Sequence, residues 1–276
     1  MSTSRYHTDP LDTLVAGECR DWATLKHDTL SRYIRITLGV RRKFAGRAGA
    51  AYIDLFSGAG RALNTDSGEF IDGSPLVALK QSLISKVPFT DVFINDIDPA
   101  LLQACRVRLE RLGAVVHPMG KDVGHAAAEV VRTLNPEGYH LAFLDPFDLG
   151  IPFSAIKTLT SLRRIDMLLH VSAMDLQRNL PKAASDPGVR RKLDTFAPGW
   201  DTAVDSVAST QRQREQFVGH WTELLAGLGA TTDTRWRLIT NSKNGPLYWL
   251  VLIARHKLAH DFWQRQGSVA PQGDLF

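Results

Sequence analysis

Cysteine is scarce in this sequence, and the two thiols that occur are far apart. Cys19 and Cys105 are the only cysteines among 276 residues, and neither stands in a cluster with the spacing of a metal site. A disulfide framework of the kind that stabilises small secreted domains is therefore excluded. We interpret both residues as reduced structural thiols of a cytoplasmic protein.

Long apolar runs are also missing. No stretch of about 18 apolar residues occurs, which excludes a membrane-spanning helix. The N-terminus carries early charges and has no apolar segment of the signal-peptide kind, which argues against secretion. Histidines, cysteines and carboxylates do not gather in a metal-type pattern, so we expect no metal.

The chain has enough apolar residues for one substantial core. It is 44% hydrophobic, which suits a single domain with a modest addition. We expect an N-terminal helical extension over residues 1–48, a main α/β domain over 49–264 and a flexible tail over 265–276. Residues 177–209 are polar and too long for an ordinary connection, so we interpret them as an insertion on the substrate side.

The run from Tyr52 to Gly60 is the most informative stretch. Its first half is apolar and predicts a buried strand. Gly58, Ala59 and Gly60 then predict a sharp turn that leaves amide N–H groups uncovered, so that a ligand can approach the backbone. The alternative is a tight connection between a strand and a helix.

Acidic residues follow the next three apolar runs, where strands are expected to end. They are Asp96, Asp122 and Asp145. Because the carboxyl ends of parallel strands line one crevice in an open doubly wound sheet, we expect these side chains to meet there. Asp96 is placed to bind both hydroxyls of a ribose and Asp122 an adenine amino group, while Asp54 would orient the glycine loop or, through water, a nearby cationic group. The alternative for each acid is an N-cap of the following helix.

Periodicity outlines the remaining elements. Residues 18–43 are predicted to be helical, and residues 61–73 are predicted to be an irregular insertion that ends at Ser74, the expected N-cap of the next helix. Strands over 235–240 and 247–254, joined across Asn244-Gly245, predict a terminal β-hairpin. This hairpin would add an antiparallel strand to an otherwise parallel sheet.

The order of glycine loop, ribose acid, adenine acid and fourth-strand acid resembles the class I S-adenosylmethionine-dependent methyltransferases. The chain is still more similar to the three-Cys-motif partner proteins, a bacterial methyltransferase-like group. The residues that carry this resemblance are Trp22, Lys26-His27, Tyr33, Asp54-Leu-Phe-Ser-Gly-Ala-Gly60, Gly73-Ser-Pro75, Asn95-Asp96-Ile-Asp98 and Asp145-Pro146. The resemblance implies a Rossmann-like class I methyltransferase sheet, mostly parallel with an antiparallel C-terminal hairpin strand, and S-adenosylmethionine as cofactor. It also makes a three-Cys-motif protein a candidate partner.

Site residues follow from the same resemblance. The expected cofactor-binding residues are Asp54, Phe56, Gly58, Gly60, Asp96, Ile97, Asp122 and Val123. Asp145-Pro146 matches the first half of the Asp-Pro-Pro-Tyr motif of amino-methylating enzymes, although Phe147 and Asp148 replace its second half. We therefore expect methyl transfer to nitrogen, with Asp145 binding the acceptor amine, Pro146 presenting a carbonyl and Phe147 either stacking on a planar acceptor or packing in the core. The alternatives are a non-catalytic cofactor-binding partner protein and a nucleotide-binding oxidoreductase.

The charge is small overall but uneven. Nine Lys or Arg and five Asp or Glu occur in the first 50 residues, an excess of four that equals the formal net charge of +4 for the whole chain. Two basic segments are prominent, and a nucleic-acid backbone is a candidate partner for both. They include Arg41, Arg42, Lys43, Arg190, Arg191 and Lys192. We expect them to form one phosphate-binding rim around the crevice; the alternative is a pair of solvated helix faces.

Overall fold

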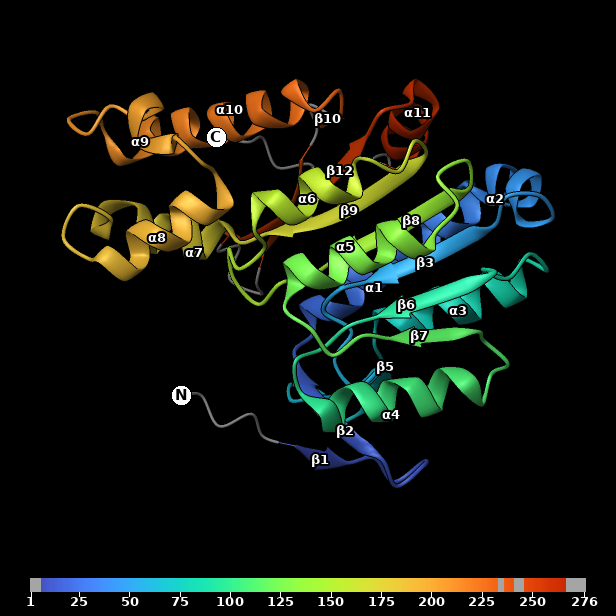
Figure 1. The fold of residues 1–276 in the computed structure, drawn as a ribbon. Helices are drawn as coiled ribbons and strands as arrows, with labels where there is room; N and C mark the ends of the chain where they lie inside the picture. The colour runs from blue at the N-terminus through green and yellow to red at the C-terminus, as the bar shows by residue number, and fades with distance from the viewer. Residues whose placement is uncertain (1–5, 233–235, 241–245, 267–276) are drawn as a thin grey trace.

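The structure is a computed structural model that describes residues 6–232, 236–240 and 246–266. A central sheet carries helices on both faces and lies beside a smaller second sheet (Figure 1). The strands of the central sheet are, in spatial order, β7 (Val116–Pro118), β6 (Asp91–Ile94), β3 (Ala50–Asp54), β8 (Tyr139–Leu144), β9 (Ile165–Val171), β12 (Pro246–Ala254) and β10 (Thr231–Thr232). Strand β11 (Arg237–Thr240) also pairs with β12.

The strand directions confirm the predicted fold class. Strands β7 to β9 run parallel to one another, and β12 runs antiparallel to β9. The terminal hairpin is present as the antiparallel pair of β11 and β12. Its predicted turn at Asn244-Gly245 lies outside the described residues. The central sheet is therefore mixed, mostly parallel and Rossmann-like, with an antiparallel strand near the C-terminus.

Helices form a layer on each face of the sheet (Figure 1). One layer contains α1 (Trp22–Ile36), α3 (Ser74–Ile84), α4 (Pro99–Glu110) and α11 (Lys257–Gln266). The other contains α5 (Val123–Thr133), α6 (Phe153–Leu159), α7 (Ala173–Asn179), α8 (Pro187–Phe196) and α10 (Thr210–Gly227). The predicted helix over 18–43 is interrupted: strand β2 (Val15–Cys19) occupies its start, and α1 ends before Thr37, after which α2 (Leu38–Ala45) begins.

Side-chain alternation along the strands decides which residues face α1. Leu141 and Phe143 of β8, like Leu168 of β9 and Leu250 of β12, pack in the core beneath α1. Because side chains on a strand alternate between the two faces, a residue two positions before or after each of these shares the same face. Asp145, His170 and Tyr248 therefore belong to the α1 side of the sheet, although they come from three different strand regions.

The second sheet corrects two predictions about the N-terminal third. It contains β1 (His7–Thr8), β2 (Val15–Cys19), β4 (Arg61–Asn64) and β5 (Phe70–Asp72), in the order β1-β2-β4-β5. Residues 61–73, predicted to be irregular, are thus an antiparallel strand pair. The N-terminal segment, predicted to be helical, supplies the two other strands. These short strands gave no sequence signal because their pairing partner, β2 for β4, lies more than 40 residues away.

The long polar segment 177–209 is mostly helical. It contains the end of α7, the 3-10 helix η1 (Leu180–Lys182), α8 and α9 (Trp200–Ala203). Phe196 of α8 stacks on Phe217 and on Trp221 of α10, and all three belong to the core on the α5 side of the sheet. In the described part of the chain, no helix combines the length and the apolar character that crossing a bilayer requires.

Candidate active site

The glycine loop directly follows β3, as the sequence predicts. Gly58 and Gly60 have φ angles of +54° and +75°, a region that favours glycine. A Cβ at Gly60 would meet Cys105 Sγ at 3.1 Å, whereas a Cβ at Gly58 would meet no atom within 4 Å. One side of the loop is thus packed against α4, and the backbone at Gly58 borders open space.

Asp54 holds the start of this loop from inside the protein. The side chain is fully buried and accepts hydrogen bonds from Tyr52 Oη (3.0 Å), Ser74 Oγ (2.7 Å) and the Phe56 backbone amide (3.1 Å). Burial raises the pKa of Asp54 to about 7, although these three donors oppose the shift. Ser74 was predicted to be an N-cap, but its hydroxyl is used by Asp54, and Gly73 occupies the cap position. Asp54 therefore holds the backbone at the start of the glycine loop, and its part in cofactor binding stays a prediction.

Asp96 connects the second parallel strand to the glycine loop. Its Oδ2 accepts from the Gly58 amide (3.1 Å) and its Oδ1 from the Asp98 amide (2.8 Å). Burial raises the pKa of Asp96, while the two amide donors act in the opposite direction. Each oxygen retains a lone pair, so the carboxylate can still accept two hydroxyl groups. Ile97, the next residue, is 79% exposed beside it and offers an apolar surface.

Asp122, unlike Asp96, binds residues of the helix that follows it. Its Oδ1 accepts from the amides of Gly124 and His125, and its Oδ2 binds the His125 ring, so Asp122 is the N-cap of α5. The hydrogen bond from His125 lowers the pKa of Asp122, whose side chain is exposed. The N-cap alternative thus applies to Asp122, and its adenine role stays a prediction. Val123 and Phe56 are half-buried and pack against the core on the α5 side.

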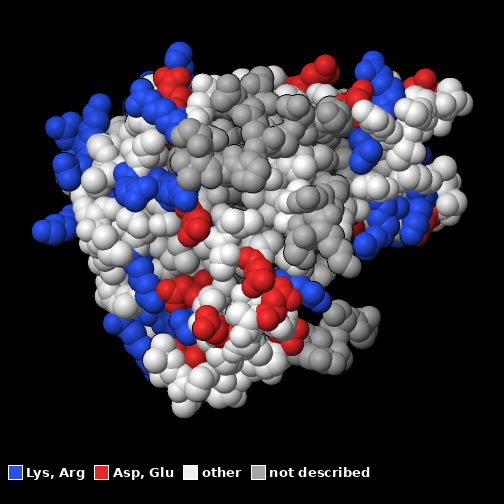
Figure 2. Space-filling view, turned by 180° about the vertical axis from the view of Figure 1, so that it is seen from behind, with Lys and Arg blue, Asp and Glu red and all other residues white. Residues whose placement is uncertain are grey.

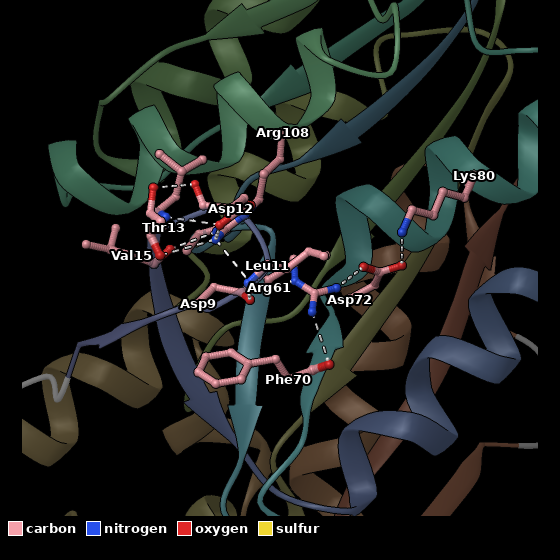
Figure 3. A network of polar contacts seen from close by, with 12 residues as sticks. Asp9, Leu11, Asp12, Thr13, Val15, Arg61, Phe70, Asp72, Lys80 and Arg108 are labelled. Atoms are coloured by element: carbon pink, nitrogen blue, oxygen red, sulfur yellow. Dashed lines mark hydrogen bonds and ion pairs between the residues drawn. The ribbon is translucent and has the colours of Figure 1, made fainter.

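An ion-pair network attaches the N-terminal strands to the glycine loop (Figure 3). Arg108 of α4 is buried; it binds both carboxylate oxygens of Asp12 (2.7 and 2.8 Å) and donates to the Ala59 carbonyl at 2.7 Å. Arg61 of β4 binds the buried Asp9 and, at 2.8 Å, Asp72 of β5. The segment before α1 is therefore bound to α4 through Asp12 and to residues 61–73 through Asp9.

Asp145 lies at the end of β8 in a cluster of polar groups. Lys26 Nζ of α1 is 2.5 Å from Asp145 Oδ2, and His170 Nδ1 of β9 is 2.7 Å from Asp145 Oδ1. His170 Nδ1 also lies 3.1 Å from the Pro146 carbonyl oxygen. Lys26 sits 5.2 Å from the centre of the Tyr248 ring, a cation–π arrangement. Lys26 is itself buried, so its charge is paired within the protein and does not extend into water.

The polar groups around Asp145 keep its carboxylate ionised. Burial alone would raise the pKa of Asp145, but the charge of Lys26 and the hydrogen bond from His170 hold it well below the usual range. Asp145 is therefore ionised at neutral pH and is too weak a base to remove a proton. His27, beside Lys26, is desolvated, and burial together with the Lys26 charge lowers its pKa to about 4, which keeps it neutral.

Phe147 is fully exposed, two residues after Asp145. The core-packing alternative for this side chain is therefore wrong. Asp148 pairs with Lys192 of α8 at 2.5 Å, and Lys192 also pairs with Asp175 of α7 at 2.8 Å. These contacts fix the helices after β9 next to the exit of β8, where a substrate-side insertion was expected.

The two basic segments lie at opposite ends of the parallel strands and do not form one rim. Arg164, just before β9, stacks on Phe44 of α2, which places α2 at the amino ends, whereas Lys192 of α8 lies at the carboxyl ends. Arg41 is buried and donates to the Val87 carbonyl, so it is not a surface cation. Viewed from the back, basic side chains gather along the α2 edge and again on the side of α8, with acidic ones between (Figure 2).

Sequence reasoning missed His170 and Tyr248 in this site. Both residues share the face of Asp145 by strand alternation, and His170 is one of two polar residues in the apolar run Ile165–Val171. That polar position in a buried strand is the signal that would have indicated it. No group of three His, Cys, Asp or Glu side chains among the residues that the structure describes is arranged to hold a metal ion.

Comparisons with known proteins describe the fold. No protein-family model matches the sequence, and no curated protein matches it. A Legionella pneumophila protein of family DUF519 shares the fold with a TM-score of 0.54 and 11% identity over 91% of both chains. Two further solved structures are more distant. One is a putative RNA methyltransferase from Pyrococcus horikoshii, with a TM-score of 0.39 and 12% identity over 82% of both chains. The other is an S-adenosylmethionine-dependent methyltransferase from Clostridium acetobutylicum, with a TM-score of 0.38 and 8% identity over 82% of this chain and 91% of that one. The likeness to the Legionella protein concerns the fold alone, a mixed and mostly parallel α/β sheet.

Proposed function

We propose that the protein is an S-adenosylmethionine-dependent methyltransferase that methylates an amine nitrogen on a planar acceptor. The observation that carries this proposal is the ionised Asp145, followed at once by Pro146 and the exposed Phe147. β3, which leads into the glycine loop, pairs directly with β8. A donor bound at the loop and an acceptor bound at Asp145 would therefore be neighbours.

The residues around the glycine loop fit the cofactor. Gly58 leaves open space where a side chain would stand, and Asp96 keeps two free lone pairs next to it. In our proposal, the ribose hydroxyls bind Asp96 and the adenine lies against Ile97 and Val123. Asp122 reaches the adenine amino group only if its carboxylate leaves the His125 ring.

Methyl transfer would give Asp145, Pro146 and Phe147 different roles. The cofactor supplies a methyl group that is already activated by the positive sulfur. Asp145 would accept a hydrogen bond from the acceptor amine and stabilise the positive charge that develops on nitrogen. Because the low pKa of Asp145 excludes proton removal by this carboxylate, the surplus proton of the methylated amine would leave to water. Phe147 stacks on the planar acceptor, and Pro146 stiffens the turn that joins the two.

The motif residues also lead us to infer membership in the three-Cys-motif partner group. Two of them, Lys26 and Asp145, are 119 residues apart and form a buried ion pair. A shared need for this pair is a physical reason why both would belong to one motif. A three-Cys-motif protein is accordingly a candidate partner or acceptor.

Nucleic acid is the acceptor class that we favour. Arg191 of α8 is exposed and forms no ion pair with any described residue, and α8 adjoins the exit of β8. A phosphate backbone held by α8 would bring its bases towards Phe147. The test is incubation with labelled S-adenosylmethionine, RNA, DNA and host lysate, followed by identification of the labelled molecule. Cofactor binding without label in any fraction would favour a non-catalytic partner protein.

Asp96→Ala provides the matching test of the cofactor site. The substitution removes two charge-assisted hydrogen bonds to the ribose, so affinity should fall at least about tenfold, which equals about 1.4 kcal/mol. Calorimetry with S-adenosylmethionine measures the change, and circular dichroism confirms that the variant is folded. Unchanged affinity in a folded variant would remove Asp96 from this role.

A further inference from the structure

His170 is bound to two acceptors at once, and this determines its tautomer. Its Nδ1 lies 2.7 Å from Asp145 Oδ1 and 3.1 Å from the Pro146 carbonyl oxygen. A carbonyl oxygen and an ionised carboxylate only accept, so Nδ1 must carry a hydrogen and donate it. The one N–H thus connects the carboxylate and the carbonyl that flank the bond between Asp145 and Pro146.

The imidazole ring is held firmly in this orientation. It is buried and meets the Tyr248 ring edge-to-face, with ring centres 4.1 Å apart and an interplanar angle of 78°. Tyr248 is in turn fixed by the hydrogen bond from its hydroxyl to the Trp22 carbonyl at 3.0 Å. His170 therefore has little freedom to turn away from Asp145.

The other ring nitrogen, Nε2, indicates why a histidine stands at position 170. Nε2 of His170 is buried without a hydrogen-bond partner among the described residues. An unsatisfied buried nitrogen costs free energy, so a side chain that only filled space here would be better replaced by an apolar one. The polar contribution of His170 is consequently the Nδ1 contact.

Asp145 is held from two sides and still has acceptor capacity. Lys26 occupies one carboxylate oxygen and His170 the other, and each oxygen has two lone pairs. The side chain remains 20% exposed, so an acceptor amine can reach it. With both donors in place, the plane of the carboxylate cannot rotate when a substrate arrives.

We propose that His170 is a positioning residue for methyl transfer, which sets the orientation of Asp145 and of the Pro146 carbonyl towards the acceptor nitrogen. This inference rests on the function proposed above. Transfer requires an aligned nitrogen and methyl group, and a displacement of about 1 Å can slow a reaction roughly 100-fold. Loss of the His170 contact should therefore affect the transfer step and spare cofactor binding.

Two isosteric substitutions separate positioning from simple packing. The amide nitrogen of Asn can replace Nδ1 of histidine, whereas that of Gln reaches the position of Nε2. We expect His170→Asn to keep the single-turnover rate within about threefold of the wild type. His170→Gln and His170→Ala should lose roughly 10-fold to 100-fold. The affinity for S-adenosylmethionine, measured by calorimetry, should be unchanged in all three.

The outcomes distinguish the inference from the function on which it rests. If the wild type transfers methyl groups and His170→Gln performs as well as His170→Asn, the positioning role is overturned. It is likewise overturned if His170→Asn is as slow as His170→Ala. A wild type that transfers no methyl group to any acceptor refutes the proposed function and, with it, the positioning role.

A second readout does not depend on catalysis. Imidazole 15N spectra of the wild type should show the hydrogen of His170 on Nδ1, and Asp145→Asn should shift this resonance because one of its two acceptors changes. A hydrogen found on Nε2 alone would contradict the geometry and overturn the proposal even in an active enzyme.

Discussion

The pair of Lys26 and Asp145 concentrates opposite charges where water has little access. The side chains are 11% and 20% exposed, and they come from the first helix of the chain and from the end of the fourth parallel strand. Removing one partner of such a pair leaves an uncompensated buried charge. Stability and the proposed catalysis thus depend on one carboxylate, and a single substitution there should have two effects.

The two effects can be separated with a double variant. Asp145→Asn should slow methyl transfer by roughly 100-fold while cofactor binding persists, because the acceptor amine loses its negative partner. It should also lower the free energy of unfolding by about 3–5 kcal/mol, because Lys26 stays charged and buried. Adding Lys26→Met should recover most of this stability, measured by urea denaturation, without recovering the rate. Normal turnover in Asp145→Asn would refute the amine-binding role.

Asp54 makes stability depend on pH in the opposite direction to an ordinary carboxylate. Its pKa is about 7 in the folded protein against 3.8 normally, so the folded state retains a proton that the unfolded state loses. The stabilising contribution is complete below pH 3.8 and is lost as pH rises to 7, by about 1.4 kcal/mol per pH unit. Asp54→Asn, which cannot ionise, should therefore gain stability relative to the wild type over this range.

Urea denaturation of both proteins between pH 4.5 and 8 measures that difference. His27, whose pKa falls to about 4 from 6.5, contributes with the opposite sign, since its stabilising effect is lost as pH falls from 6.5 to 4. It is present in both proteins and cancels in the comparison. Parallel stability curves would show that Asp54 is already ionised at low pH.

Helix α4 attaches the segment before α1 to the glycine loop. Arg108 donates to Asp12 in the turn between β1 and β2 and to the Ala59 carbonyl in the glycine loop, so one guanidinium holds both (Figure 3). Tyr6 also donates to Asp98, two residues after the proposed ribose acid. The N-terminal strands therefore support the wall of the proposed cofactor site.

Arg108→Met tests this attachment, with Arg106→Met on the same helix as the control. Arg108→Met leaves the largely desolvated carboxylate of Asp12 without its partner, whereas Asp9 keeps Arg61, and should cost about 3–5 kcal/mol of unfolding free energy. Arg106 forms an exposed pair with Glu110 four residues later, worth about 0.3–0.5 kcal/mol. Thermal and urea denaturation compare the two variants. Equal small losses would show that the Arg108 network is not structural.

The whole molecule has two separate basic ends. Parallel strands of five to seven residues separate them, at about 3.3 Å per residue. Arg42, Lys43 and Arg47 of the α2 end are exposed, and Arg42 and Arg47 have no ion-pair partner among the described residues. Only the α8 end adjoins the proposed acceptor site.

Binding to an oligonucleotide of about five nucleotides should therefore respond to one end only. Arg190→Ala with Arg191→Ala should weaken binding and make its salt dependence shallower by about 0.7 for each phosphate contact removed. Replacing Arg42, Lys43 and Arg47 with Ala should change neither quantity for this short ligand. Fluorescence anisotropy across a salt series measures both. An effect of the α2 variant alone would move the nucleic-acid site to the other end, and no salt-sensitive binding at all would favour a protein or small-molecule acceptor.

Local features of the sequence predicted a large part of this protein. Strand β3 and the glycine loop follow from an apolar run and from residues that tolerate positive φ, which are properties of a few adjacent residues. The parallel sheet with its C-terminal hairpin follows from the spacing of such runs. Asp96 and Asp145 were indicated as site residues because strand ends in this topology share one edge.

Contacts between distant residues decided what the sequence alone left open. The ion pair of Lys26 with Asp145, the second sheet from residues 61–73 and the burial of Arg41 each depend on a partner that lies 40 or more residues away. Likewise, only the fold distinguishes the roles of the acids that follow the strands, since Asp122 caps α5 whereas Asp96 binds the glycine loop. The sequence determined which elements form, because propensity and periodicity are local; the tertiary structure determined which charges are buried and paired, because desolvation depends on everything packed around them.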